Sequence, residues 1–180
     1  RQAQSNVTSL REAIVEKGIP VLATSSTCTF TLRDEYPHLL DVDNTGLREH
    51  IELATRFLWR KLDSGQTLPL GKLPLKVVYH TPCHMEKMGW SLYTLELLRL
   101  IPGLELTVLD SRCCGIAGTY GFKRENYETS QAIGAPLFRQ IEESGADIVV
   151  TDCETCKWQI EMSTSKRCEH PITLLAKALG

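Results

Sequence analysis

Residues 147–157 read DIVVTDCETCK and join a short β-branched run to a C-x-x-C motif. The run from Ile148 to Val150 predicts a short buried strand, because β-branched side chains favour extended backbone. Cys153 and Cys156 follow at a spacing that is typical of thiolate ligands to a metal. The motif is therefore expected to begin just past the end of the strand.

The same order of strand and cysteine occurs twice more upstream. The run Val77 to Tyr79 precedes Cys83 in the stretch VVYHTPCH, and the run Leu106 to Leu109 precedes Cys113 and Cys114 in LTVLDSRCCG. The carboxyl ends of neighbouring parallel strands meet at one edge of a sheet. If the three runs are such strands, all five thiols gather at that edge.

Helical and extended patterns alternate along the chain, which predicts an α/β protein with a parallel sheet and helices on both faces. Apolar residues that recur every three or four positions from Thr45 to Gly65 predict one long amphipathic helix there. Ser9 and Glu12 have the spacing of a capping box, so we expect the first helix to begin at Ser9. The other expected elements are strands at 19–23, 75–79, 104–109 and 147–151, and helices at 84–100, 124–144, 153–163 and 173–179.

The stretch from Gly65 to Pro74 is rich in glycine and proline and is the best internal boundary. Upstream of it, the segment Val21 to Cys28 aligns without gaps on Val149 to Cys156, with Ser25 in place of the first thiol. This similarity predicts an internal repeat. The expected organisation is the end of a first copy plus a linker helix in residues 1–70 and a second, complete copy in residues 71–180.

Composition limits the class of protein. The 180 residues are 42% apolar, which is enough to bury a core, and the formal net charge of −2 provides no field that would attract nucleic acid. The most apolar run, Leu92 to Leu106, is interrupted by charged residues, proline and glycine and predicts no membrane span. Seven cysteines without a signal peptide favour free thiols in a reducing compartment over a disulfide framework. Because the sequence begins at Arg1 rather than Met, we expect a fragment of a longer protein.

Five thiols at one edge favour a multi-iron cluster over zinc. Thiolates are soft ligands that suit both, but a closed zinc site takes four ligands and has no place for a fifth. Gly115, Gly118 and Gly121 follow the cysteine pair, and we expect their backbone to approach a cofactor closely. A structural zinc-thiolate module that docks subunits is the alternative. A thiol enzyme with a low-pKa Cys156 ranks last, because no motif provides its general base.

Two histidines, two further cysteines and four cations also have expected roles. His80 and His84 bracket Cys83 and are expected either to ligate metal or, as the favoured reading, to hydrogen-bond to backbone or to cluster sulfur. Cys28 and Cys168 are expected to be small buried apolar residues. Four cations adjacent to the cysteines in sequence either offset the charge of a thiolate cluster or are plain surface residues: Arg112, Lys123, Arg124 and Lys157.

The arrangement resembles the cysteine-rich CCG domain, in which single C, CC-G and C-x-x-C segments recur at similar intervals. Here 29 residues separate Cys83 from Cys113, and 38 separate Cys114 from Cys153. The family includes the B subunit of heterodisulfide reductase, the iron-sulfur subunits of glycolate and lactate oxidases, and the C subunits of anaerobic glycerol-3-phosphate dehydrogenases. The three cysteine stretches resemble these C subunits most, and the resemblance covers nearly the whole chain.

The resemblance implies an electron-transfer subunit, not itself catalytic, that holds a [4Fe-4S] cluster. In heterodisulfide reductase this cluster is noncubane, and some other relatives bind zinc at the motif. The resemblance also implies flavin-containing dehydrogenase subunits as partners and membrane quinone as electron acceptor. The complex would oxidise glycerol 3-phosphate and attach peripherally to the cytoplasmic face of the inner membrane. Carried onto this chain, the cluster ligands would be Cys83, Cys113, Cys114, Cys153 and Cys156.

Overall fold

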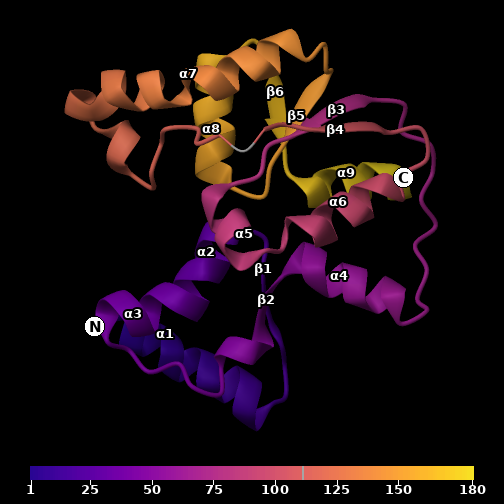
Figure 1. Cartoon of the computed structure of the whole chain (residues 1–180). Coiled ribbons are helices and arrows are strands. Elements are labelled where there is room, and N and C mark those ends of the chain that lie inside the picture. Colours follow the sequence, from indigo (N-terminus) through magenta and orange to yellow (C-terminus); the bar gives the residue numbers. More distant parts are fainter. Residues whose placement is uncertain (111) are drawn as a thin grey trace.

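The computed structural model describes residues 1–110 and 112–180 and has the expected α/β class with parallel sheets (Figure 1). The larger sheet has the strand order β4-β3-β5-β6, and all of its pairings are parallel. In register, Val78 aligns with Thr107 on one side and with Val149 on the other. The strands are β3 Lys76–Tyr79, β4 Glu105–Val108, β5 Ile148–Val150 and β6 Arg167–Glu169.

Helices cover both faces of this sheet, as predicted (Figure 1). Successive strand residues point to opposite faces, so the sheet takes part in two cores. Val78 and Val149 belong to the core that includes residues of α7 and α8, whereas Val77, Tyr79 and Val150 belong to the core that includes residues of α6 and α9. The helices of this half are α5 Cys83–Met88, α6 Ser91–Arg99, α7 Tyr127–Glu143, α8 Glu154–Ser163 and α9 Pro171–Leu179.

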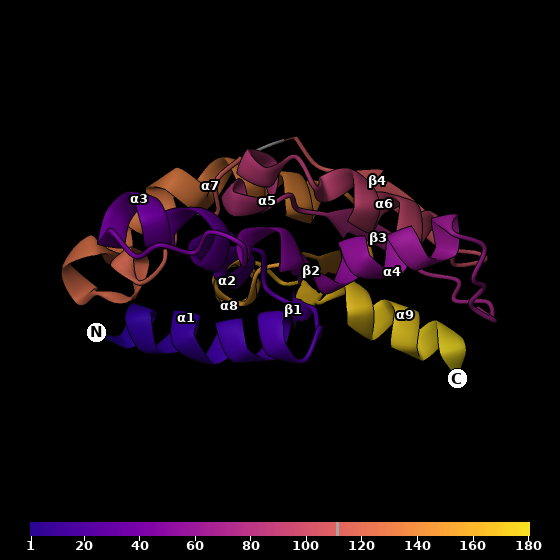
Figure 2. The ribbon, with the colours of Figure 1, turned by 90° about the horizontal axis from the view of Figure 1, so that it is seen from below.

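A smaller sheet lies in the N-terminal part. Strand β1, Val21–Ala23, pairs in parallel with β2, Ile51–Leu53, beside a separate core that contains Val7, Tyr36 and Leu47. Figure 2 shows α1 along one side of the molecule, the side on which α9 also lies, with the two termini at opposite ends. The helices of this part are α1 Gln2–Arg11, α2 Ser26–Phe30, α3 Tyr36–Leu40 and α4 Ala54–Asp63, with π-helical turns at Glu12–Glu16 and Thr31–Glu35.

The predicted helix from Thr45 to Gly65 is wrong in its first half. Residues 48–50 form a 3₁₀ turn, β2 follows, and only α4 is helical. Residues 51–53 form a strand because they pair with β1, which lies about thirty positions earlier in the chain, and all three are buried. Glu52 of β2 is buried although it is charged, and it binds Arg56 at 3.0 Å and Arg60 at 3.1 Å.

Three further boundaries differ from the prediction. The helix expected at 84–100 is two helices, because Gly89 at φ +68° ends α5 in the left-handed conformation. Strand β6 was not predicted, because a three-residue strand with one apolar side chain carries almost no periodicity. Ser9 and Glu12 do not cap a helix, since α1 begins at Gln2 and runs past Ser9.

The part of the chain that the structure describes holds no helix with the length and apolar character that crossing a membrane requires.

Candidate metal centre

Three neighbouring strands deliver the five predicted thiols to one edge of the larger sheet. Cys83 begins α5 after β3, Cys113 and Cys114 lie in the loop after β4, and Cys153 is the N-cap of α8 after β5. Parallel strands place these three segments at the same end of the sheet. All five thiols, Cys156 of α8 included, line one cavity of about 450 Å³, and none is in a disulfide.

The sulfur atoms in this cavity lie close to one another and to backbone donors. Cys114 Sγ is 3.4 Å from Cys156 Sγ. Cys153 Sγ accepts a hydrogen bond from the backbone N–H of Cys156 at 3.4 Å, as the cap of α8. Cys113 Sγ accepts one from the N–H of Gly115 at 3.3 Å. Such donors stabilise negative charge on sulfur.

These contacts divide the thiols into two groups. The pKa of Cys153 is lowered to about 5, chiefly by the hydrogen bond from Cys156, and the pKa of Cys113 is lowered by hydrogen bonds from Cys114 and Cys83. The pKa values of Cys83, Cys114 and Cys156 are raised, because each is hydrogen-bonded to a neighbouring sulfur and is also desolvated. The reading of Cys156 as a low-pKa nucleophile is therefore wrong.

His80 lies directly beside the thiols. It follows β3, is 1% exposed, and has a ring nitrogen that lies together with the sulfurs of Cys114 and Cys156 in a group whose members are all within 4.8 Å of one another. Neither ring nitrogen has a hydrogen-bond partner, so the expected bond to backbone is not formed. Burial lowers the pKa of His80 to about 4.

The N-terminal part supplies one wall of the cavity, which sequence reasoning missed. Thr27 and Glu35 line the cavity, and Thr27 Oγ1 lies 3.7 Å from Cys153 Sγ. The same hydroxyl is 3.1 Å from Nδ1 of His84, whose ring stacks on Phe30. His84 therefore faces the N-terminal part. The similarity of residues 21–28 to the C-x-x-C segment was the one sequence signal that could have drawn attention to this wall.

A buried polar network fixes the turn that carries Cys153. Asp152 is fully buried and accepts hydrogen bonds from the Tyr79 hydroxyl at 2.6 Å and the Thr94 hydroxyl at 3.2 Å. Its main-chain carbonyl accepts a hydrogen bond from Ser26 N–H at 2.8 Å. Burial raises the pKa of the Asp152 carboxyl to about 6. The network ties this turn to β3, α6 and α2.

The glycines after the cysteine pair have two different roles. A Cβ at Gly115 would lie 2.0 Å from the carbonyl oxygen of Ser130, and one at Gly121 would lie 2.3 Å from Ser130 Oγ. These two glycines let the cysteine loop pack on α7, a role that the sequence pattern did not reveal. Their close approach to a cofactor stays a prediction. Gly118 lines the cavity, and a Cβ there would meet nothing within 4 Å.

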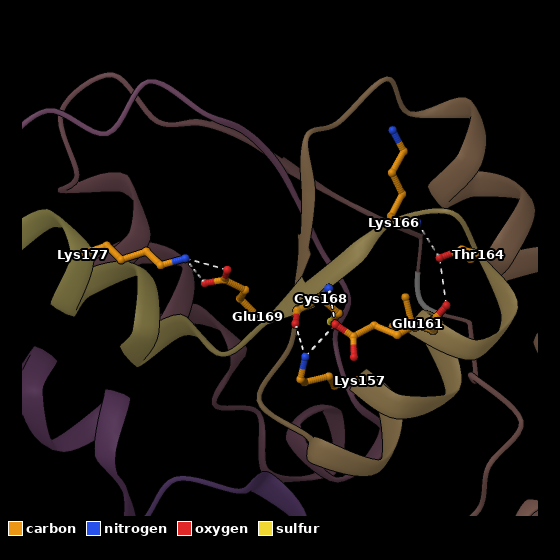
Figure 3. Close-up of polar contacts among 8 residues, drawn as sticks. Lys157, Glu161, Thr164, Lys166, Cys168, Glu169 and Lys177 are labelled. Atoms are coloured by element: carbon orange, nitrogen blue, oxygen red, sulfur yellow. Dashed lines mark hydrogen bonds and ion pairs between the residues drawn. The ribbon is translucent and has the colours of Figure 1, made fainter.

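The cations predicted near the cysteines are mostly surface residues. Lys157 Nζ binds Glu161 Oε1 at 2.7 Å and the carbonyl oxygen of Cys168 at 2.5 Å (Figure 3). These contacts direct the Lys157 charge toward β6 and pair it with a carboxylate. The other three cations are exposed: Arg112, Lys123 and Arg124.

The remaining two cysteines are not among the residues that line the cavity. Cys168 of β6 is buried in the core below α8, as expected, and burial raises the pKa of its thiol to about 12. Cys28 of α2 is exposed, so the expectation of a buried residue is wrong there. Its helix presents Ser26 and Thr29 to the interior instead.

The residues of the cavity fit a metal centre. Five soft donors meet in one place, two of them already favour the thiolate form, and a buried imidazole beside them lacks a partner. Both iron-sulfur clusters and zinc accept such donors. Ordinary core packing would leave the pKa of every buried thiol raised, as it does for Cys168.

Comparison with known proteins agrees with this geometry. A family model described as a cysteine-rich domain matches residues 77–161, a range that contains all five thiols. The C subunit of the anaerobic glycerol-3-phosphate dehydrogenase of Escherichia coli strain K12 is 84% identical over all 180 residues, which make up 46% of that protein. The chain therefore spans about half the length of this relative.

More distant relatives match parts of the chain. Lactate utilization protein A of Bacillus licheniformis is 32% identical over 146 residues, which cover 74% of this chain and 58% of the relative. An uncharacterized iron-sulfur protein of Methanocaldococcus jannaschii is 32% identical over 96 residues, which cover 52% of this chain and 19% of the relative.

Proposed function

The chain belongs, over residues 77–161, to the cysteine-rich CCG domain family, and on this premise we propose that its five thiols hold a [4Fe-4S] cluster that carries electrons for a dehydrogenase complex. The ligands would be Cys83, Cys113, Cys114, Cys153 and Cys156. When bound, such a cluster supplies one-electron transfer. The observation that carries the proposal is the convergence of five thiols, from the three segments that follow β3, β4 and β5, on one cavity.

The chain's own groups are suited to hold a negatively charged centre. The N–H groups of Gly115 and Cys156 donate to sulfur, and the N-terminus of α8 adds its positive dipole end beside Cys153. Pro82 and Ile116 contribute apolar surface to the cavity. Hydrogen bonds to sulfur and restricted solvent access are two of the means by which a protein sets the potential of such a centre.

The proposed biological setting is based on the similarity to the relatives. Because an Escherichia coli protein named as the C subunit of an anaerobic glycerol-3-phosphate dehydrogenase is 84% identical to this chain, we infer the same kind of complex here. The proposed partners are flavin-containing dehydrogenase subunits, and the proposed acceptor of the electrons is membrane quinone. Association with the membrane would be peripheral, through the complex, at the cytoplasmic face of the inner membrane.

The two-copy organisation, residues 1–70 and 71–180, is part of the same proposal. Its support is a match of element order between the two parts. Strand β1, helix α2, parallel strand β2 and helix α4 follow the same order as β5, α8, β6 and α9, except that α3 and short helical turns lie between α2 and β2. In this reading, β1 and β2 are the counterparts of the last two strands of the larger sheet.

The test is metal analysis of the full chain purified without oxygen, together with its EPR spectrum. We expect about four iron atoms and a matching amount of acid-labile sulfide per chain. Cys114→Ser and Cys153→Ser should lose this cluster. Cys28→Ser is the matched control, because Cys28 is exposed and does not line the cavity, and it should retain the cluster. Full iron and sulfide in both ligand variants would refute the proposal.

A structural zinc module is the second candidate. It is favoured by one observation, the grouping of His80, Cys114 and Cys156, since nitrogen and sulfur donors are those that structural zinc takes. This candidate predicts a colourless protein that contains zinc but no sulfide. Its thiols would resist alkylation until a chelator removes the metal.

A further inference from the structure

His80 is a buried polar side chain that has no hydrogen-bond partner within the described part of the protein. In the part of the chain that the structure describes, it is the one residue with two buried side-chain nitrogens and no hydrogen-bond partner for either. The ring cannot turn to water, because the residue is 1% exposed. A buried donor without a partner costs free energy, so such a group in a native protein calls for an unseen partner such as an ion.

The backbone of His80 holds the ring in this place. Its main-chain N–H donates to the carbonyl of Val150 at 2.9 Å, which continues the pairing of β3 and β5 to the edge where the thiols lie. The ring nitrogen and the sulfurs of Cys114 and Cys156 lie within 4.8 Å of one another, but neither thiol is a hydrogen-bond partner of the ring. We therefore expect a partner that is not part of the protein to lie beside the ring and these two sulfurs.

We propose that His80 is a sixth group of the metal centre and donates an N–H hydrogen bond to a sulfur atom of the bound cluster beside Cys114 and Cys156. The inference rests on the proposed function. An imidazole carries at least one N–H in either protonation state, so a donor is always present. Donation to sulfur disperses negative charge and favours the reduced cluster, so His80 should hold the midpoint potential at a less negative value.

The experiment compares three variants of the full chain, purified without oxygen. His80→Leu removes the donor, and His80→Gln retains an N–H of similar reach. His50→Asn is the matched control, because His50 is exposed in the turn before β2. The measurements are iron and sulfide content, an EPR-monitored redox titration, and pulsed EPR of protein labelled with ¹⁵N-histidine.

We expect all three variants to retain the cluster. The midpoint potential should become more negative in His80→Leu, return toward the original value in His80→Gln and stay unchanged in His50→Asn. The unsubstituted protein should show coupling between the cluster and histidine nitrogen that disappears in His80→Gln. This coupling also decides the matter if His80→Leu fails to fold, and its absence from the unsubstituted protein would overturn the inference.

Other outcomes separate this inference from the proposed function. An unchanged potential in a folded, iron-loaded His80→Leu protein would overturn the role of His80 alone. Loss of iron from both His80 variants, with circular dichroism unchanged, would also overturn hydrogen-bond donation, because the ring would then be an iron ligand. Absence of iron and sulfide from the unsubstituted protein would overturn the proposed function and this inference together.

Discussion

Replacement of Gly115 by alanine tests whether the glycine after the cysteine pair serves packing. Gly115 has a φ of +87°, a conformation that side chains disfavour, and its added Cβ would lie 2.0 Å from the carbonyl oxygen of Ser130. An ordinary contact is at least 3.4 Å, so the loop and α7 would have to separate by about 1.4 Å. The obstacle is helix backbone, which cannot rotate away as a side chain can.

Gly118 is the matched control for the size of the effect. It has a φ of +65°, but a Cβ there would meet nothing within 4 Å. Alanine at Gly118 should cost only backbone strain, about 1–2 kcal/mol of unfolding free energy. Alanine at Gly115 should cost this strain and, in addition, about 1–3 kcal/mol of overpacking. The entropy that alanine removes from the unfolded chain favours both variants equally and cancels in the comparison.

The assay is urea unfolding of both reduced, metal-free variants under argon, followed by iron and sulfide analysis after reconstitution. Gly115→Ala should be less stable than Gly118→Ala by about 2 kcal/mol, which corresponds to a melting temperature lower by roughly 4–8 °C for a chain of this length. It should also lose much of its iron, because Cys113 and Cys114 move with the loop. Equal stability of the two variants would refute the argument that this loop needs glycine to pack on α7.

Three other predictions concern buried groups. Tyr79→Phe removes the hydroxyl that donates to Asp152 and should lower the free energy of unfolding by about 1.5–3 kcal/mol in urea titrations, whereas an unchanged midpoint would contradict the buried network. Cys168→Ala should destabilise the protein by about 1–2 kcal/mol and leave the iron content unchanged. Loss of iron in this variant would indicate that Cys168 belongs to the metal centre. Because the pKa values of Cys114 and Cys156 are raised, both thiols should be protonated in the metal-free protein, and binding of Zn²⁺ in weakly buffered solution should release protons. The Zn²⁺ affinity should therefore rise with pH by roughly tenfold per pH unit for each proton released. An affinity that does not depend on pH would show that these thiols are not protonated.

Most of the fold around the candidate site could be predicted from the sequence. Three short β-branched runs, each followed by cysteine, were enough to predict parallel strands with thiols at their C-terminal ends, because both signals are local. The error at residues 45–53 has a different origin. Ile51 fits a helical stripe with Leu47 and Leu58, and only pairing with β1 places it in a strand.

The surroundings of the thiols were less predictable than the thiols themselves. His80 was noted because it lies close to Cys83 in sequence, but its lack of any partner depends on what the fold packs around the ring. The roles of Gly115 and Gly121 depend on where α7 passes the cysteine loop. The contact of Thr27 with Cys153 joins residues that are 126 positions apart.

The sequence by itself determined the α/β class and the set of five thiols at one sheet edge. Strand propensity, alternation of elements and cysteine spacing are properties of short segments, and parallel strand order converts them into one location. Only the tertiary structure decided which sulfurs touch, which thiols favour the charged form, and that an N-terminal segment closes the cavity. These features depend on distances between side chains of remote segments, which are set when the two sheets and their helices pack together.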